Sequence, residues 1–318
     1  MGRSGEPVRF DGDVRAVEHI IRTQPRWRAY LRAMRLERWP RSLSIAPGWA
    51  FALIVSHRTP DLMDIVSGVI AYLATLGTSV FNYTVNEIVD LPYDVHHPIK
   101  RNRPLVQGLI SRTVLLTLGT TILGISAILG WWLNRNTLLT LSALVLAGVI
   151  YNIRPIRAKD IPFIDAIAES VNNPIRFLIG WYCLRWVHRW PSVWILIAWW
   201  AFGAFLMYIK RFSEKMSLRD DIAQAYRRSL YAYSARSLRW AMGISACVMI
   251  AAVAVAAVDL DRPRLYWMIP LLAVYALWIY IETAHRPQKN GEPEALLRRP
   301  QFLTLTILLT AGLIWSVW

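Results

Sequence analysis

Long apolar runs constrain the fold of this chain more than any other feature of its sequence. Most of them are near the roughly 17–25 residues that a helix needs to cross a bilayer. Backbone polar groups cannot stay unpaired in lipid, so such runs predict transmembrane helices. The sequence therefore predicts an all-α membrane protein, a bundle of about nine transmembrane helices. The runs occupy residues 42–57, 63–89, 113–133, 136–151, 161–182, 192–209, 240–258, 265–283 and 301–318.

Positive charge is distributed unevenly around these runs. With the amino terminus in the cytoplasm, the segments on that side carry 29 of the 36 lysines and arginines. The opposite loops carry six, and Arg176 lies inside a run. This asymmetry follows the positive-inside rule and predicts a multi-pass protein of the bacterial inner (plasma) membrane with a cytoplasmic amino terminus. It also accounts for the net charge of +15, so no nucleic-acid partner is expected.

The chain divides into a charged amino-terminal segment and one membrane domain. Residues 1–40 lack the continuous apolar core of a cleavable signal. Within them, residues 14–38 predict a basic amphipathic helix on the inner membrane surface, with a disordered segment as the alternative. Residues 41–318 form the predicted transmembrane domain. The two cysteines, Cys183 and Cys247, indicate neither a disulfide framework nor a zinc site.

Oxygen ligands recur where the second apolar run ends. Asn86, Asp90 and Asp94 are spaced by four residues, which places them on one face of a continuous helix. Mg²⁺ takes one or two carboxylates together with substrate phosphates, so this face predicts a magnesium site. Pro92 predicts that the helix breaks or kinks near Asp90, which would leave Asp94 to reach back from a loop.

The loop that follows is strongly basic. Lys100, Arg101 and Arg103 lie within ten residues of the last carboxylate. The positive-inside rule alone would produce such a loop, but it does not explain the acidic series before it. Cations beside metal-binding carboxylates indicate a pyrophosphate site. His96 and His97 have no further histidine or cysteine at zinc spacing, so a capping or loop role is expected for both.

A second loop of mixed charge leads into the fifth apolar run. Asp160 is a favoured N-cap for a helix that begins near Pro162, and a ligand role is the alternative. Asp165 lies one turn into the run, where a buried carboxylate needs a partner, so it predicts a second metal or substrate site. Two such loops facing each other would enclose a cavity for one polyanion. The polar residues of this loop are Asn152, Arg154, Arg157, Lys159, Asp160 and Asp165.

Further charged residues lie at or inside the runs. Lys210 and Arg211 end the sixth run, and Glu214 is spaced to pair with Lys210 on a helix. The charged loop that follows them predicts a mainly solvated surface. Arg176 and Glu169 lie inside the fifth run and are expected to face the bundle interior. They are two turns apart, which favours contact with substrate over pairing with each other.

These motifs resemble those of the UbiA superfamily of intramembrane prenyltransferases. That family has nine transmembrane helices and binds a diphosphate through magnesium, and its first motif is Asn-Asp-x-x-Asp-x-x-x-Asp. Here the motif runs Asn86, Glu87, Asp90 and Asp94, followed by Arg103-Pro104-Leu105. Glu87 replaces the usual aspartate, and the second aspartate motif is looser than the usual four-residue spacing. The resemblance covers residues 35–318.

A further likeness is to the decaprenyl-phosphate phosphoribosyltransferase branch of that superfamily. As a stretch, residues 169–176 do not match that branch, and their polar residues inside an apolar run indicate a different acceptor. The likeness rests on residues 97–104, 210–214 and 228–230, on Tyr233, and on the intervals between Lys159, Asp165 and Arg176.

The resemblance implies a transferase that uses Mg²⁺ to ionise a diphosphate at the cytoplasmic membrane face. The implied catalytic residues are Asp90, Asp94 and Asp165. The implied metal ligands are Asn86, Glu87, Asp90, Asp94, Asp160 and Asp165. The implied substrate-binding residues are Lys100, Arg101, Arg103, Tyr151, Lys159, Arg176, Lys210 and Arg211.

Three functions stay open at this point. Prenyl transfer from a prenyl diphosphate to an acceptor is slightly favoured, because residue 87 and residues 169–176 depart from the phosphoribosyltransferase pattern. Phosphoribosyl transfer from phosphoribosyl diphosphate to a polyprenyl phosphate is the alternative. A transporter or scaffold is disfavoured, because the acidic groups gather at one face and not at the bilayer midplane. The expected partners are an isoprenoid diphosphate or polyprenyl phosphate and the lipid bilayer, and homo-oligomerisation stays open.

Overall fold

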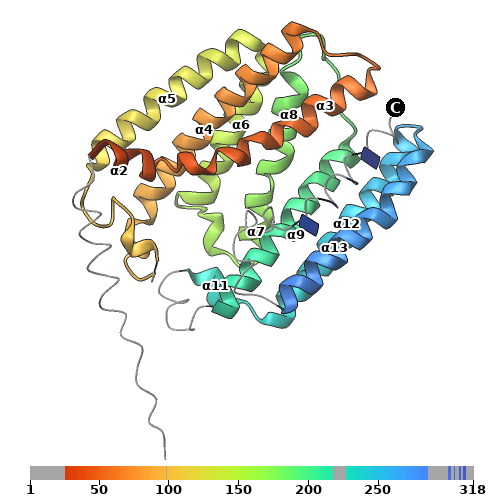
Figure 1. Cartoon of the computed structure of the whole chain (residues 1–318). Coiled ribbons are helices and arrows are strands. Elements are labelled where there is room, and N and C mark those ends of the chain that lie inside the picture. Colours follow the sequence, from red (N-terminus) through yellow and green to blue (C-terminus); the bar gives the residue numbers. More distant parts are fainter. Residues whose placement is uncertain are drawn as a thin grey trace, which may run out of the picture.

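The chain folds into a bundle of helices (Figure 1). A computed structural model describes residues 26–97, 99–217 and 227–285, together with positions 300, 301, 304, 308, 311 and 312. No strand occurs in these residues. The helices are α2 (Arg26–Ala33), α3 (Ala46–Val55), α4 (Leu62–Asp94), α5 (Arg112–Leu133), α6 (Arg135–Asn152), α7 (Ile164–Ser170), α8 (Asn172–Tyr182), α9 (Val193–Ser217), α11 (Arg228–Ala232), α12 (Ala235–Asp259) and α13 (Met268–His285). Short 3-10 helices are η1 (Leu36–Ile45), η2 (Lys100–Asn102), η3 (Ala158–Asp160) and η4 (Pro263–Trp267).

The apolar runs correspond to helices, which confirms the predicted all-α membrane architecture. Five described segments are long and apolar enough to cross a bilayer: α4, α5, α9, α12 and Pro263–His285. The first run is divided between η1 and α3, and the fifth between α7 and α8. The ninth run, residues 301–318, lies mostly outside the described residues.

The amino-terminal segment is described only from Arg26 onward. Of the amphipathic helix predicted over residues 14–38, the part before Arg26 lies outside the described residues. The rest forms α2, after which the backbone turns at Arg35, where φ is 53°. Trp27 on α2 is 58% exposed, as an interfacial tryptophan would be without its membrane.

Helix α4 is the longest helix and carries the first acidic motif. Asp61 and Asp64 form a reciprocal capping box at its start. Its 33 residues extend about 50 Å at 1.5 Å per residue, which exceeds the roughly 30 Å hydrocarbon core. The last turns therefore reach the membrane surface. Of the break or kink predicted near Asp90, the break is wrong, because α4 continues through Pro92 to Asp94, which belongs to the helix and not to a loop. Membrane helices tolerate the loss of the one backbone hydrogen bond that proline cannot donate.

Helices α3 and α8 approach each other closely at two glycines. A Cβ on Gly48 would lie 1.9 Å from the carbonyl oxygen of Phe177. A Cβ on Gly180 would lie 1.9 Å from the carbonyl oxygen of Ile45. Small residues allow this approach, and van der Waals contact then holds helices together where lipid offers no hydrophobic driving force. The contact fixes α8, and with it Arg176, beside η1.

The remaining helices complete the bundle around α6 and α9. Helix α6 contacts both α4 and α8, and α9 packs along α12. Figure 1 shows α12 and α13 running side by side along one edge, with α5 at the opposite edge. The carboxyl-terminal ends of α4, α6 and α9 meet η3, α7 and α11 at one end of the bundle. The polar clusters lie there.

Candidate active site

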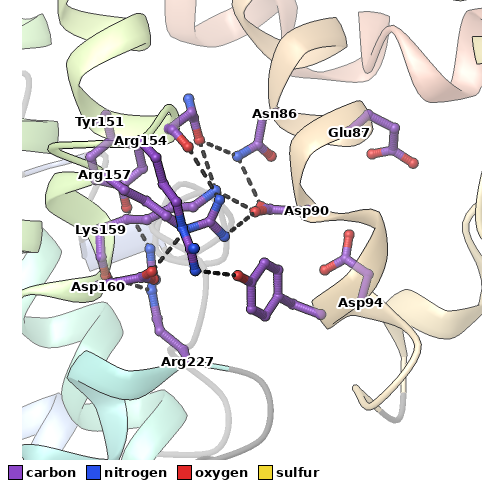
Figure 2. A network of polar contacts seen from close by, with 12 residues as sticks. Asn86, Glu87, Asp90, Asp94, Tyr151, Arg154, Arg157, Lys159, Asp160 and Arg227 are labelled. Atoms are coloured by element: carbon purple, nitrogen blue, oxygen red, sulfur yellow. Dashed lines mark hydrogen bonds and ion pairs between the residues drawn. The ribbon is translucent and has the colours of Figure 1, made fainter.

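The acidic residues of α4 face two directions (Figure 2). Asn86 and Asp90 contact each other and face the second charged loop, whereas Glu87 and Asp94 contact arginines of other segments. Asn86 Nδ2 donates to Asp90 Oδ2 over 3.0 Å. Glu87 and Asp94 instead lie on the side of α4 away from Lys159. The series that the spacing predicts on one face is therefore divided into two groups. We call these four residues and their cationic partners the α4 cluster.

Asp90 binds two cations from the second charged loop. Arg157 Nη2 donates to Asp90 Oδ1 over 3.1 Å, and Lys159 Nζ donates to the same oxygen. Lys159 also donates to Asn152 Oδ1 over 3.0 Å. Burial lowers the pKa of Lys159 to about 8, although the Asp90 carboxylate opposes this shift. The two charged loops thus meet across Asp90.

Glu87 and Asp94 bind arginines from two other segments. Arg35 Nη2 donates to Glu87 Oε2 over 2.8 Å. Arg103 Nη1 donates to Asp94 Oδ2 and lies 3.4 Å from Glu87 Oε2. The side chains of Glu87 and Asp94 are only 2% and 1% exposed. Glu87 Oε1 and Asp94 Oδ1 nevertheless have no hydrogen-bond partner among the described residues. A buried carboxylate oxygen without a partner is costly, so these atoms mark a place for a ligand.

The two unpartnered oxygens fit a divalent cation. Mg²⁺ takes one or two carboxylates and completes its shell with water and substrate phosphate. Glu87 and Asp94 supply that number of carboxylates, and no cluster of three His, Cys, Asp or Glu side chains occurs in the described part of the chain. Asp90, Asp160 and Asp165 have protein cations as partners. The ligand roles of all six residues, Glu87, Asp94 and Asn86 included, stay predictions.

The basic loop after α4 is organised by His97. His97 Nδ1 accepts the backbone N–H groups of Ile99 and Lys100 over 3.1 and 3.3 Å. Burial lowers the pKa of His97 to about 4, so the ring stays neutral and can accept. The predicted loop role of His97 is confirmed. Burial also lowers the pKa of Lys100 to about 7, which the nearby Glu214 opposes and Lys210 reinforces. Arg101 is exposed.

A second cluster gathers around Arg211 of α9. The Arg211 side chain is 1% exposed. Its Nε donates to Asp165 Oδ2 and its Nη1 to Glu214 Oε2, both over 2.7 Å. Its Nη2 donates to the Tyr151 hydroxyl over 3.2 Å and to Glu169 Oε2 over 3.4 Å. Glu214, which the spacing placed beside Lys210, thus binds Arg211. We call this group the Arg211 cluster.

Asp165 is the central carboxylate of the Arg211 cluster. Tyr233 donates its hydroxyl to Asp165 Oδ1, and Ser229 donates to Oδ2 over 3.2 Å. Both oxygens therefore have partners, and the residue is fully buried. Asp165 lies one turn into the fifth run, as predicted, and in the first turn of α7, which begins at Ile164. Its predicted metal role stays a prediction.

Asp160 does not cap α7. Its Oδ2 accepts from Arg157 Nε over 2.8 Å. The cap position belongs to Phe163, which makes no side-chain cap bond and whose backbone N–H donates to the Tyr233 hydroxyl over 2.7 Å. The predicted N-cap role is wrong, because the ion pair holds the carboxylate in η3 and the chain turns again before the helix starts.

Tyr151 links the two clusters. Its hydroxyl donates to Glu169 Oε2 over 2.7 Å and accepts from Arg227 Nη2 over 2.6 Å. Arg227 Nε also donates to the carbonyl oxygen of Lys159 over 3.3 Å. The two clusters are thereby connected through one phenol and one guanidinium.

Three arginines at the site were not predicted there: Arg35, Arg157 and Arg227. Arg157 has a local signal, because it lies in the same short loop as Lys159. Arg35 and Arg227 have none. Their partners Glu87 and Tyr151 lie 52 and 76 residues away along the chain. Arg35 and Arg227 themselves lie in basic segments that the positive-inside rule already explains.

A polar cavity of about 100 Å³ lies beside the α4 cluster. It is bounded by η1, α4, α6, α7 and α8. Asn86 and Asn152 stand between it and Asp90. Arg176 and Glu169 both line it, which places these two residues in the bundle interior as expected.

Comparisons with known proteins identify the family. A model of the UbiA prenyltransferase family matches residues 44–314. The chain belongs to this family. It is therefore an integral membrane transferase of the UbiA type, and the resemblance drawn from the motifs is confirmed.

Two curated proteins that are similar in sequence have the same name. The decaprenyl-phosphate phosphoribosyltransferase of Mycolicibacterium smegmatis is 25% identical over 235 residues, covering 73% of this chain and 71% of that protein. The protein of the same name from Mycobacterium tuberculosis is 24% identical over 286 residues, covering 87% of this chain and 90% of its own length.

Solved structures of the UbiA family confirm the fold. A UbiA homolog from Archaeoglobus fulgidus bound to GPP and Mg²⁺ matches with a TM-score of 0.70 at 19% identity, covering 91% of this chain and 99% of that one. The apo UbiA homolog from Aeropyrum pernix K1 matches with a TM-score of 0.60 at 14% identity, covering 88% and 99%.

Proposed function

We propose that this chain is a magnesium-dependent phosphoribosyltransferase, which cleaves phosphoribosyl diphosphate at the α4 cluster and transfers the phosphoribosyl group to a polyprenyl phosphate. The observation that carries this proposal is a cluster of cations beside two buried carboxylates, Glu87 and Asp94, that each keep one oxygen without a partner among the described residues. Glu87, Asp90 and Asp94 are met by four cations, and two further cations, Lys100 and Arg227, stand beside them. These four are Arg35, Arg103, Arg157 and Lys159.

The choice of donor rests on charge and on the relatives. Phosphoribosyl diphosphate carries a third phosphate on the ribose, which makes use of more cations than one diphosphate requires. The curated relatives that cover most of the chain bear the name decaprenyl-phosphate phosphoribosyltransferase. Both facts support a ribosyl donor.

The residues of the α4 cluster would divide the work between metal and phosphate. Glu87 and Asp94 would hold Mg²⁺, which neutralises charge on a departing diphosphate when bound. Arg103 and Lys100 lie on the loop beside them and suit charge-assisted hydrogen bonds to phosphate oxygens. The bond between the anomeric carbon and the diphosphate oxygen breaks, the diphosphate leaves with the electron pair, and an oxygen of the acceptor phosphate bonds to that carbon.

Prenyl transfer from a prenyl diphosphate is the second candidate. It is favoured by residues 169–176, which depart from the phosphoribosyltransferase pattern and contribute Glu169, Asn172 and Arg176 to the cavity beside the α4 cluster. A different acceptor would explain that departure.

One experiment separates the two candidates. Purified protein is incubated with Mg²⁺, a lipid extract and either labelled phosphoribosyl diphosphate or a labelled prenyl diphosphate. We expect the ribosyl label to enter the lipid phase, and we expect Asp94→Asn or removal of Mg²⁺ with EDTA to prevent this. Transfer of the prenyl label alone would replace the proposal with the second candidate. Transfer of neither label, with either lipid extract or polyprenyl phosphate added, would overturn both.

A further inference from the structure

Helix α2 and the η1 segment after it carry an excess of arginine. Residues 26–43 contain six arginines and one acidic residue. The positive-inside rule explains such an excess near a membrane, but not its arrangement in space. Arg28 and Arg32 are one turn apart on α2, and both are exposed. Trp27 and Leu31 are also one turn apart and are 58% and 37% exposed. A pair of arginines and a pair of apolar side chains therefore lie side by side on the outer face of the helix.

The exposed apolar surface continues from α2 onto η1. Trp39 and Leu43 of η1 are 49% and 47% exposed. On α2, the guanidinium carbon of Arg28 lies 5.3 Å from the centre of the Trp27 ring, within cation–π range. Apolar rings beside guanidinium groups are typical of interfacial helices, whose rings reach the acyl chains while their cations stay among the headgroups. We call the exposed residues of this surface the α2–η1 face: Arg26, Trp27, Arg28, Leu31, Trp39 and Leu43.

The other side of α2 is packed against the bundle, at the point where α5 begins. Helix α2 lies at the edge of the bundle beside α4 (Figure 1). Ala33 and Met34 form one apolar cluster with Leu115 in the first turn of α5. The backbone N–H of Ser111, just before α5, donates to the Tyr30 hydroxyl over 3.1 Å. Because α5 is long and apolar enough to cross a bilayer, this contact places the α2–η1 face at the membrane surface.

Arg35 connects the α2–η1 face to the α4 cluster. Its backbone N–H donates to the carbonyl oxygen of Arg32 on α2 over 3.1 Å. Its side chain donates to Glu87 Oε2 over 2.8 Å. The backbone of Arg35 has a φ of 53°, a conformation that a residue other than glycine keeps only where its surroundings hold it. An interaction that holds α2 in place therefore also holds Arg35 on Glu87.

We propose that the α2–η1 face binds anionic phospholipid headgroups of the adjacent leaflet, and that this binding strengthens the α4 cluster by holding Arg35 on Glu87. Charge complementarity selects the lipid class. Arginines near an anionic membrane surface each add to the attraction, whereas a zwitterionic headgroup offers them no net charge. The effect on the α4 cluster rests on the proposed function, because Glu87 is a proposed metal ligand. The binding of headgroups does not.

Native mass spectrometry of the full chain in a neutral detergent tests headgroup binding. The probes are phosphatidylglycerol and phosphatidylcholine with the same acyl chains, each titrated alone. We expect the wild type to bind phosphatidylglycerol more tightly by about tenfold or more. The double variant Arg26→Gln with Arg28→Gln should lose about tenfold to thirtyfold in phosphatidylglycerol affinity, the loss expected for two arginines at an anionic surface. Equal affinity of the wild type for the two lipids would overturn the proposal.

A matched double variant assigns the binding to this face. Arg185→Gln with Arg189→Gln removes the same charge from two exposed arginines at the other end of the bundle, where Arg185 donates to the carbonyl oxygen of Trp132 near the end of α5. Its phosphatidylglycerol affinity should equal that of the wild type, and an equal loss would contradict the assignment. Displacement of phosphatidylglycerol by an equal concentration of farnesyl phosphate would contradict it too, because the face would then receive the lipid acceptor.

Pyrophosphate binding tests the link through Arg35. Its affinity with Mg²⁺ is measured in nanodiscs of phosphatidylcholine and in nanodiscs of an equal mixture with phosphatidylglycerol. A negative surface by itself repels pyrophosphate and lowers its affinity. We expect the mixture instead to raise the affinity of the wild type by about fivefold or more. The variant with Arg26→Gln and Arg28→Gln should lose this increase, and the variant with Arg185→Gln and Arg189→Gln should keep it.

The outcomes separate this inference from the proposed function. An unchanged or lower pyrophosphate affinity of the wild type in the mixture would overturn the link through Arg35. If pyrophosphate binds in neither kind of nanodisc, the proposed function fails and the link fails with it. The binding of anionic headgroups to the α2–η1 face is decided by the mass spectra in either case.

Discussion

The α4 cluster and the Arg211 cluster use the same kinds of side chain but differ in how fully their hydrogen bonds are formed. In the Arg211 cluster both oxygens of Asp165 have protein partners. In the α4 cluster Glu87 and Asp94 are equally buried, yet each keeps one oxygen without a partner among the described residues. Completed ion pairs fasten helices, whereas an incomplete buried carboxylate indicates where a ligand belongs.

The difference also predicts what each cluster contributes. Arg211 joins α9 to α7 and, through Tyr151, to α6. Removing one partner of such a buried pair leaves a charge without compensation and costs about 3–5 kcal/mol. The proposed function assigns a cation and phosphate to the α4 cluster, so substitutions there should lower turnover more than stability.

Both clusters are expected at the cytoplasmic membrane face. Cysteine labelling from each side of the membrane tests this orientation, and its result is all-or-none. A cysteine at Gln107, after the α4 cluster, should react with an impermeant maleimide only from the cytoplasmic side. A cysteine at Asp261 should react only from outside. A Cys247→Ser background removes the exposed native thiol. Reversed labelling would move both clusters to the other membrane face.

The largest functional effect is expected at the α4 cluster. Asp94→Ala removes one of the two unpartnered carboxylates and leaves Arg103 without its closest acceptor. Turnover should fall by about a thousandfold, the scale of losing a main electrostatic contribution. The unfolding temperature should stay within a few degrees, because Arg103 is partly exposed and still lies 3.4 Å from Glu87 Oε2. Steady-state transfer of labelled donor measures the first, and thermal unfolding in detergent measures the second. Substantial activity in this variant would remove Asp94 from the site.

The opposite pattern is expected at the Arg211 cluster. Asp165→Asn leaves the fully buried Arg211 with a weaker partner and should lower the free energy of unfolding by about 3 kcal/mol. Asp160→Asn is the matched control, because the Asp160 side chain is 27% exposed and pairs with Arg157 in η3. It should cost less than about 1 kcal/mol. Equal stability of the two variants would erase the distinction between the clusters.

The smallest effect is expected in the basic loop after α4, where the charge of Lys100 should make pyrophosphate affinity depend on pH. Burial lowers the pKa of Lys100 to about 7, so its positive charge is present below that pH and lost above it. Affinity for pyrophosphate should therefore fall as pH rises from 6 to 8, by up to about tenfold. Lys100→Arg keeps the charge and should flatten this dependence. A titration that has the same slope in both proteins would exclude Lys100 from anion binding.

The sequence specifies the fold more completely than the site. Apolar runs of membrane-spanning length predict the helices well, since lipid leaves the backbone few alternatives. The meeting of Lys159 with Asp90 also follows, because two charged loops lie on the same side. Pro92 misleads, because a membrane helix can continue through one missing bond. The division of the α4 residues depends on Arg35 and Arg103, whose positions local sequence does not define.

The contacts of the Arg211 cluster could not be predicted from the sequence either. Sequence spacing does not predict that Asp165 pairs with Arg211 and Tyr233. A charged residue at a helix end has the same sequence signature whether it holds a neighbouring helix or a substrate. The structure distinguishes a carboxylate that holds a helix from one that binds a substrate, because it shows whether each carboxylate oxygen has a hydrogen-bond partner.

Equilibrium binding of phosphoribosyl diphosphate tests the central claim most directly. Calorimetry would compare the wild type, Asp94→Asn and Tyr233→Phe, each with Mg²⁺ and with EDTA. Tyr233→Phe removes one hydrogen bond from Asp165, which keeps its ion pair with Arg211. The account predicts Mg²⁺-dependent binding that is weakened at least a hundredfold in Asp94→Asn and is within about threefold of the wild type in Tyr233→Phe. Binding that ignores Mg²⁺, or that depends on Tyr233 and not on Asp94, would contradict it.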